Sequence, residues 1–338
     1  MKKIIFISLI IFALFSSCKN QDWSFPNFDY TTVYFAYQYP VRTIELGDDN
    51  VVDNSLDNAH QCQIMGTFGG AYSSKSDIQI GIQVDNSLCS GLSFSDGGAV
   101  IPMPSNYYSL SSNQITIPKG QVMGGVTVQL TDAYFADPLS IKTTYVIPVV
   151  MKNVQNADSI LSGSPNVDNP NRCVASDWSV TPKDYILYAV KYINPWDANY
   201  LRRGVDMITK GGTTEMAVRH GQYVENDEVI KLTTQSLTQD ILSLSYKDED
   251  NEDVPYDILL TFDNTGNCTI SSITDNCTAK GNGQFVEKGD KNSWGNQDRN
   301  VLYLNYDVDF ADRHYATTDT LVVRDRGISL QTFDVTHN

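Results

Sequence analysis

The stretch LYLNYDVDF, residues 302–310, alternates residue by residue between two kinds of position. One set consists of Leu302, Leu304, Tyr306 and Val308, and the other of Tyr303, Asn305, Asp307 and Asp309. Side chains on a strand point alternately to opposite faces of its sheet. The pattern therefore predicts an antiparallel strand with one buried face and one wet face.

Similar strand-like runs lie on both sides of this stretch, with turn residues between them. They cover residues 215–219, 229–233, 242–246, 256–262, 268–273, 283–287, 301–310, 319–324 and 328–333. Eight or more consecutive strands with tight turns favour an up-and-down barrel, because closure removes the open sheet edges. We therefore predict an antiparallel β-barrel over residues 179–338, opening with the strand in DYILYAVKYI, residues 184–193.

The first half of the chain shows a different set of short strands. The run TTVYFAYQYPVRTIEL, residues 31–46, is rich in β-branched and aromatic residues, and further runs lie at 61–66, 78–84, 114–117, 126–130 and 145–151. About seven short strands at this spacing favour an antiparallel sandwich, which we place at residues 29–160. Residues 161–178 contain Pro, Gly and Ser with little periodicity, and we predict an interdomain linker there.

The N-terminus has the form of an export signal. Lys2 and Lys3 precede the apolar run 4–15, and small residues then lead to Cys18. This order is typical of a secretory signal and resembles a bacterial lipoprotein signal, with Cys18 as the lipidated first residue of the mature protein. The alternatives are an ordinary signal peptide or a buried apolar strand. We expect a signal at residues 1–18, a polar tether at 19–28 and a lipid anchor in the outer membrane at the cell surface.

The overall charge limits the partners. The formal net charge is −16, from 24 basic and 40 acidic residues. Such a chain repels nucleic acid and anionic lipid surfaces, so we expect neither as a partner. We expect contact with the membrane through the N-terminal lipid anchor only. The cysteine and histidine spacing matches no zinc motif, and we predict no metal and no cofactor. Cys268 and Cys277 could form a disulfide across a hairpin or remain free buried thiols.

Two groups of segments resemble known families. Residues 34–37 (YFAY), 117–121 (IPKGQ), 128–139 (VQLTDAYFADPL) and 145–148 (YVIP) resemble the immunoglobulin-like N-terminal domain of Bacteroidetes-type surface lipoproteins. The same domain precedes some family-18 endoglycosidases. Residues 191–204 and 321–327 resemble the barrel that often follows it, which is similar to the calycin group and its lipocalins. The resemblance implies an all-β fold, an immunoglobulin-like sandwich plus a calycin-like barrel, and a role in glycan uptake.

No catalytic constellation stands out. The sequence contains no HExxH, GxSxG, GxGxxG or P-loop pattern. Residues 180–338 are too few for the (β/α)₈ barrel of a family-18 enzyme. We therefore predict that the protein is not an enzyme, although chance pairs among its many acids leave a cryptic glycosidase as a third hypothesis.

Aromatic platforms are the better candidates for binding. Sugars pack apolar C–H faces on Trp and Tyr rings, while neighbouring polar groups bond their hydroxyls. The first candidate set is Trp196, Asp197, Tyr200 and Arg202, and the second is Trp294 with Asn292, Asn296 and Asp298. The structural alternatives are that Trp196 plugs the barrel floor and that Trp294 packs within its own loop.

The sequence thus favours a non-catalytic, lipid-anchored, cell-surface glycan-binding protein that serves a polysaccharide utilisation system. The second hypothesis is a structural or adhesive surface module with protein partners, which a flat apolar patch or an open strand edge would favour.

Overall fold

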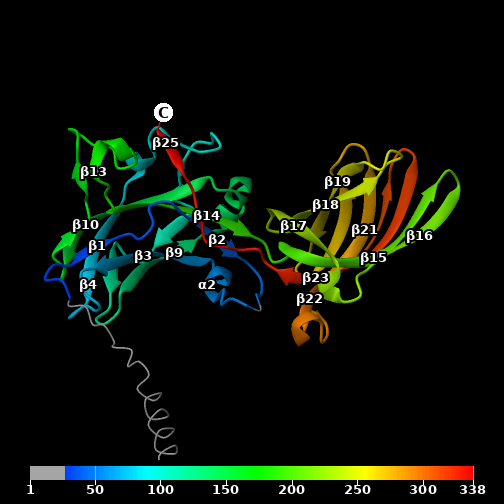
Figure 1. The fold of residues 1–338 in the computed structure, drawn as a ribbon, viewed down its shortest axis with the longest axis horizontal. Helices are drawn as coiled ribbons and strands as arrows, with labels where there is room; N and C mark the ends of the chain where they lie inside the picture. The colour runs from blue at the N-terminus through cyan, green and yellow to red at the C-terminus, as the bar shows by residue number, and fades with distance from the viewer. Residues whose placement is uncertain (1–26, 50, 338) are drawn as a thin grey trace, which may run out of the picture.

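The computed structural model describes residues 27–49 and 51–337, and this part of the chain is built mainly of β-strands (Figure 1). The predicted signal with Cys18, and nearly all of the predicted tether, lie outside the described residues. No helix within the described ranges is both long and apolar enough to cross a membrane. The predicted all-β class, a sandwich followed by a barrel, is confirmed.

Two sheets form the N-terminal part. The first contains β1 (Thr32–Tyr34), β3 (Gln61–Gly69), β7 (Tyr108–Leu110), β9 (Met123–Leu130) and β11 (Ser159–Ile160). The second contains β2 (Pro40–Glu45), β4 (Ile78–Val84), β6 (Ile101–Pro102), β8 (Gln114–Ile117), β10 (Tyr145–Gln155), β14 (Tyr185–Ile193) and β24 (Gln331–Thr332).

Shorter elements surround these sheets. They are the helices α2 (Ser55–Asn58) and α3 (Asp132–Phe135), the 3₁₀ turns η1 (Asn86–Cys89), η2 (Pro138–Ile141) and η3 (Ala175–Asp177), and the strands β5 (Leu92–Phe94), β12 (Ser164–Pro165), β13 (Trp178–Val180) and β25 (Val335–His337).

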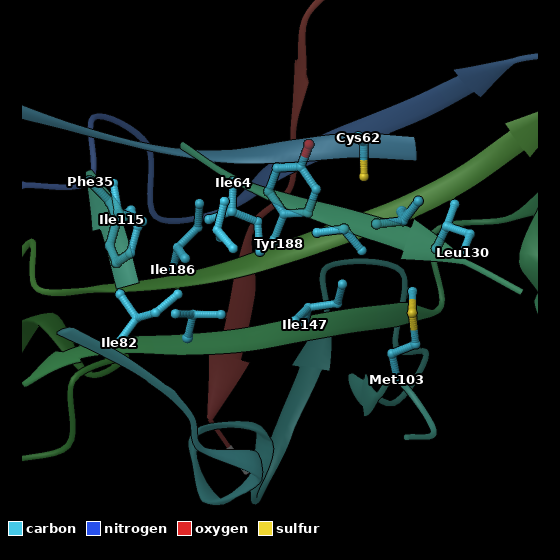
Figure 2. Close-up of a cluster of buried hydrophobic side chains, with 14 of the residues drawn as sticks. Phe35, Cys62, Ile64, Ile82, Met103, Ile115, Leu130, Ile147, Ile186 and Tyr188 are labelled. Atoms are coloured by element: carbon cyan, nitrogen blue, oxygen red, sulfur yellow. The ribbon is translucent and has the colours of Figure 1, made fainter. Parts of the chain in front are cut away.

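The two sheets bury a common apolar core (Figure 2). Phe35 and Ile64 come from the first sheet and its connections, and Ile115, Ile147 and Ile186 come from the second, all of them fully or nearly fully buried. The apolar positions alternate along β3 and β4, as expected for strands that cover a core with one face. Burial of this apolar surface is the main force that holds the sandwich together.

The strand β14 corrects the predicted domain boundary. We expected residues 179–338 to form the barrel, but β14 pairs antiparallel with β10 and parallel with β2 inside the sandwich. All six residues of Tyr185–Val190 are buried, because a second apolar cluster covers the other face of this sheet. A run that is apolar at every position indicates a strand covered on both faces, and a barrel strand with one wet face would alternate.

The end of the chain also returns to the sandwich. β24 pairs with β2, and β25 pairs with β5, so the C-terminal segment lies against the N-terminal domain (Figure 1). The predicted run 328–333 is therefore no barrel strand. In the predicted linker, β12 and β13 form a small hairpin, in which Ser164 pairs with Val180.

The C-terminal domain is the predicted antiparallel barrel. Its strands are β15 (Ala198–Lys210), β16 (Thr213–Arg219), β17 (Glu228–Ser236), β18 (Gln239–Lys247), β19 (Asp253–Phe262), β20 (Asn267–Ser272), β21 (Thr278–Asp290), β22 (Arg299–Asp309) and β23 (Arg313–Asp325), with the 3₁₀ turns η4 (Val224–Asn226) and η5 (Trp294–Asn296). The ring closes because β15 pairs with β17 on one side and with β23 on the other. β16 pairs with the second half of β15 and widens the wall there.

Side chains fill the barrel interior at the end nearest the sandwich. Leu302, Leu304, Tyr306 and Val308 are buried as predicted, whereas Tyr303, Asn305 and Asp309 are exposed. The apolar cluster of the interior also includes Cys268 and Cys277, and all five cysteines in the described ranges are free. The alternation in residues 302–310 thus assigns the two faces of β22 correctly.

One buried arginine joins the two domains. Arg326 Nη2 donates hydrogen bonds to the carbonyl oxygens of Leu46 (3.0 Å) and Asn194 (2.7 Å), and its Nε donates to the carbonyl oxygen of Asp197 (2.7 Å). Glu45 Oε1 lies 3.6 Å from the same Nε. These partners come from the end of β2, the end of β14 and the start of the barrel, so one guanidinium connects all three.

Asn194 completes this junction from the barrel side. Its side-chain amide donates to Asp240 Oδ2 (2.7 Å) and to the carbonyl oxygen of Ser236 (3.0 Å), and its side-chain oxygen accepts from the backbone N–H of Trp196 (3.0 Å). The side chain of Asn194 is fully buried. The turn after β14 is therefore connected to the barrel floor by one side chain, because an amide carries both the donor and the acceptor that these hydrogen bonds need.

Replacing Arg326 tests the junction. Arg326→Ala would leave three buried carbonyl groups without their donor and Glu45 without its cation. We expect the free energy of unfolding, measured by urea denaturation, to fall by about 3 kcal/mol or more. Arg324→Ala is the matched control, because the side chain of Arg324 is 49% exposed, and a change within about 0.5 kcal/mol is expected. An equally small loss for Arg326→Ala would contradict this account of the junction.

The buried Asp240 predicts a pH dependence. Burial raises the pKa of Asp240 to about 8, so the folded chain holds a proton that the unfolded chain releases at lower pH. The free energy of unfolding should therefore fall as the pH rises from about 4 to about 8, by up to about 1.4 kcal/mol per pH unit. Asp240→Asn should make this slope shallower in urea titrations across that range, while the part due to Glu45, whose pKa burial raises to about 7, remains. The exposed Asp275→Asn serves as control and should keep the slope of the wild type.

Candidate functional site

The far end of the barrel contains a polar cup. β15 runs from Ala198, beside the junction, to Lys210 at the opposite end, where β16 widens the wall. A cavity of about 430 Å³ opens there, and the side chains that line it include Arg202, Asp206, Glu215, Arg219, Glu228 and Tyr256. We call this cavity the cup. Its volume lies in the range of small-ligand pockets, which often occupy the mouths of β-barrels.

Asp319 lies beneath the floor of the cup and holds Arg202 and Arg219, two arginines that line it. Its carboxylate accepts hydrogen bonds from Arg202 Nε (3.0 Å), Arg219 Nη2 (2.6 Å) and the Tyr306 hydroxyl (2.9 Å). Asp319 is 1% exposed, so its charge is removed from water and compensated within the barrel. The three donors hold this carboxylate in one position.

A second ion pair lies beside the first. Asp206 accepts a hydrogen bond from Thr317 Oγ1 (2.7 Å) and forms an ion pair with Arg219. Arg219 therefore spans two buried aspartates, and its Nε is buried without a hydrogen-bond partner. Buried ion pairs cost desolvation energy and rarely add stability over apolar packing. A charged floor under an open cavity is therefore a feature that binding explains better than stability does.

Three tyrosines, Tyr246, Tyr256 and Tyr315, form one wall of the cup. Phe310 packs behind them, and the four rings make contacts with centroid distances from 4.4 to 6.4 Å. The guanidinium of Arg313 lies 4.6 Å from the ring centroid of Tyr246. Burial raises the pKa of Tyr256 to about 12, so its hydroxyl stays protonated and can donate a hydrogen bond at neutral pH.

Glutamates supply acceptors at the rim. Glu215 is exposed, and Glu228 lies 3.4 Å from Arg202 while its side chain remains 53% exposed. Carboxylates that accept and Tyr and Arg groups that donate are thus arranged around one cavity, next to apolar ring surface. This combination suits vicinal hydroxyl groups, each of which donates one hydrogen bond and accepts others. Across residues 27–49 and 51–337, no group of three or more side chains has the arrangement of a metal site.

The first predicted set of site residues is divided by the structure. Trp196, Asp197 and Tyr200 lie at the junction end, where Trp196 stacks on Phe262 with ring centroids 4.0 Å apart and Tyr200 is fully buried. Asp197 is occupied by the backbone N–H and hydroxyl of Thr234 (2.8 and 2.9 Å). These three side chains cannot contact a glycan, because each of them is at least 90% buried, and Trp196 fills the barrel floor. Arg202 alone lines the cup.

The second set occupies one loop, but its tryptophan is covered. The guanidinium of Arg299 lies 3.6 Å from the ring centroid of Trp294, whose Nε1 donates to the carbonyl oxygen of Val323 (3.3 Å). Below the ring, Leu201, Val301 and Val322 form a small apolar cluster on the outside of the barrel. Trp294 is therefore a packing residue that shields this cluster, and no open stacking platform forms.

The polar members of that loop shape its backbone. Asp298 accepts from the backbone N–H of Asn292 (3.0 Å) and from Lys291 Nζ (2.9 Å). Asn292 and Asn296 have positive φ angles of 48° and 55°, in the left-handed region that Asn tolerates better than most residues. Asn292, Asn296 and Asp298 are exposed, and they stabilise the turn of their own loop instead of surrounding the Trp294 ring.

Sequence reasoning missed most of the cup. Asp206 and Arg219 lie on the two strands of one hairpin, but Asp319 follows 100 residues after Arg219, and no motif links the three. A partial signal was present, because Asp319 interrupts the apolar positions of its strand on the inward-facing side. A charged residue at an inward position of a barrel strand indicates a polar interior, but the partner residues follow only from the strand register.

The comparisons with known proteins follow the domain division. A family model for a domain of unknown function, DUF5627, matches residues 195–327, which is the barrel. A model described as a "-like, N-terminal domain" matches residues 27–158, within the sandwich. No curated protein matches the chain.

Two solved structures from Bacteroides ovatus resemble the chain. One, a structural genomics protein of unknown function, shares 49% identity with a TM-score of 0.86, and the match covers 92% of this chain and 100% of that one. The other, a multidomain protein including DUF1735, shares 11% identity with a TM-score of 0.40 over 89% of this chain and 97% of that one. The second likeness is too distant to support an argument.

Proposed function

The chain belongs to the family of that Bacteroides ovatus protein of unknown function, and on this premise we propose that it is a non-catalytic glycan-binding protein whose cup receives the end of a sugar chain. The observation that carries the proposal is the cup itself. An aromatic wall, a fixed ionic floor and rim carboxylates enclose one cavity at the mouth of a barrel whose interior is otherwise filled. A closed floor admits the end of a chain and excludes a chain that passes through.

The floor chemistry supports binding over catalysis. A glycosidase needs one carboxylic acid that holds a proton for the leaving group, opposite a second carboxylate. Asp319 accepts hydrogen bonds from two arginines and a tyrosine, and Asp206 pairs with Arg219. Both carboxyl groups are therefore occupied by donors of the barrel itself, and Asp319 is buried beneath the cavity. A cryptic glycosidase is therefore the weaker alternative.

A second candidate function has one observation in its favour. β16 pairs with β15 alone, so among the described pairings its other edge is open. Met207, Met216 and Val218 expose 41%, 65% and 54% of their surface on these two strands. An open edge with exposed apolar side chains favours contact with another protein. This is the structural or adhesive module.

The proposal includes the cellular location. We propose that the protein is exported, is lipidated at Cys18 and serves a polysaccharide utilisation system at the outer-membrane surface, based on the residues that precede Cys18. Cells fed a radiolabelled fatty acid should incorporate label into the wild type and none into Cys18→Ala, with both proteins detected by immunoblot. Equal labelling of the two would contradict the anchor, and shaving of intact cells with protease would test surface exposure.

Two cup variants test the binding function. Tyr256→Phe removes one donor and keeps the ring, and Glu228→Gln replaces a carboxylate by an amide of the same size. A glycan array identifies an oligosaccharide, and calorimetry then measures its dissociation constant for each variant. We expect Glu228→Gln to bind about 10-fold to 100-fold more weakly, since a hydrogen bond to a charged group contributes about 1.5 to 3 kcal/mol. Tyr256→Phe should bind about 2-fold to 10-fold more weakly, since a hydrogen bond between neutral groups contributes about 0.5 to 1.5 kcal/mol.

The matched control for these variants is Glu225→Gln, which changes an exposed glutamate in η4 outside the cup. It should bind like the wild type. Full affinity in both cup variants would mean that the cup is not the site. A wild type that binds no glycan on the array would overturn the function and favour the adhesive module.

A further inference from the structure

The outer face of the barrel carries a polar hollow of about 710 Å³ over β19, β20, β21, β22 and β23. Its lining includes two acids, of which Asp263 is exposed at the turn after β19 and Asp319 is buried and directed into the barrel. Outward side chains form two cross-strand rows, because their residues pair directly in the strand register. The first row is Thr261, Thr269, Asn282, Asn305 and Thr318, and the second is Asn267, Gln284, Tyr303 and Thr320. None of the side chains in the two rows is charged, although the chain as a whole contains 24 basic and 40 acidic residues.

Two glycines lie on the inner face of β21, behind the hollow. A Cβ at Gly283 would lie 2.5 Å from Leu304 Cδ2, and one at Gly281 would lie 2.5 Å from Tyr306 Cβ. Neighbouring side chains thus occupy the space that inward side chains of β21 would need. Glycine within a strand commonly marks a bend or a close approach.

Tyr303 supplies an apolar surface within the neutral rows. It is 42% exposed and pairs directly with Gln284 on one side and Thr320 on the other. An exposed ring flanked by amides and hydroxyls offers a stacking face together with groups that both donate and accept hydrogen bonds. This chemistry matches a sugar ring, which has an apolar C–H face and hydroxyl groups around its edge.

The surface fits other partners poorly. The core of a protein interface is usually rich in apolar and aromatic side chains, and Tyr303 is the one large exposed aromatic residue in these rows. Nucleic acid would require cations, which the two rows lack. The acidic chain also repels anionic polysaccharides, so a neutral polymer is favoured.

We propose that this hollow binds an internal stretch of a neutral polysaccharide chain, as a second site separate from the cup. The proposal rests on the proposed function in that both assign glycan as the ligand. An open surface admits a chain that continues in both directions, whereas the cup admits an end. Two sites on one molecule raise the effective affinity for a long polymer without any new contact.

Affinity electrophoresis tests the hollow with defined polymers. The gels contain galactomannan, xyloglucan or mixed-linkage β-glucan, which are neutral, or polygalacturonate, which is anionic. We expect retardation of the wild type in at least one neutral gel and none in polygalacturonate. Tyr303→Ala and Gln284→Ala should each weaken that binding about tenfold, the size typical of a central contact residue.

Two controls separate this site from folding and from the cup. Tyr72→Ala removes a tyrosine that is 64% exposed on the sandwich and should migrate like the wild type, and circular dichroism confirms folding of each variant. The double variant Tyr256→Phe/Glu228→Gln should keep its retardation in the gel while losing the calorimetric affinity for the short oligosaccharide.

The outcomes that overturn the proposal differ from those for the cup. Unchanged retardation in both Tyr303→Ala and Gln284→Ala would overturn the hollow, as would a wild type that no gel retards or one retarded by polygalacturonate alone. A negative glycan array together with retardation that Tyr303→Ala abolishes would overturn the cup and support the hollow.

Discussion

The whole arrangement depends on one buried guanidinium. Arg326 lies between the sandwich and the barrel and donates to carbonyl groups from the end of β2, the end of β14 and the start of the barrel. A buried cation is stable only when its donors and its charge find partners, so these three backbone segments are held in one relative position. With Asn194 tied to the barrel floor from the same place, the junction end is closed. The barrel interior therefore opens at the far end, where the cup lies.

The barrel uses its two ends for different purposes. Trp196, Phe262 and Tyr200 fill the junction end with apolar surface, whereas ion pairs around Asp319 occupy the open end. An apolar floor contributes stability through burial, and an ionic network contributes a fixed set of donors and acceptors at a cost in desolvation. The outer hollow adds a third kind of surface, which is open and lined mainly by uncharged polar side chains. One strand, β22, contributes to both sides, since Tyr306 bonds Asp319 within the barrel and Tyr303 lies on the hollow outside.

Much of the fold could be predicted, and the site could not. The alternation of residues 302–310 assigned the faces of β22, and the predicted strands 78–84 and 114–117 agree with β4 and β8. The error at β14 arose because a continuous apolar run shows burial on both faces without showing in which sheet. A tryptophan among polar residues predicts an exposed platform, but the neighbours of Trp196 and Trp294 in space are Phe262 and Arg299. No local pattern reports those contacts.

By itself, the sequence determined the local properties of each strand. These are the alternation of apolar and polar residues, the face that is buried and the turns at the strand ends, since they follow from side-chain chemistry over a few residues. It also determined the acidic charge and the predicted signal before Cys18. Only the tertiary structure decided which strands share a sheet, which aspartates share an arginine and which outward residues form rows. Those relations depend on register between strands that are distant in the chain, and a shift of one residue would move every side chain of a strand to the opposite face.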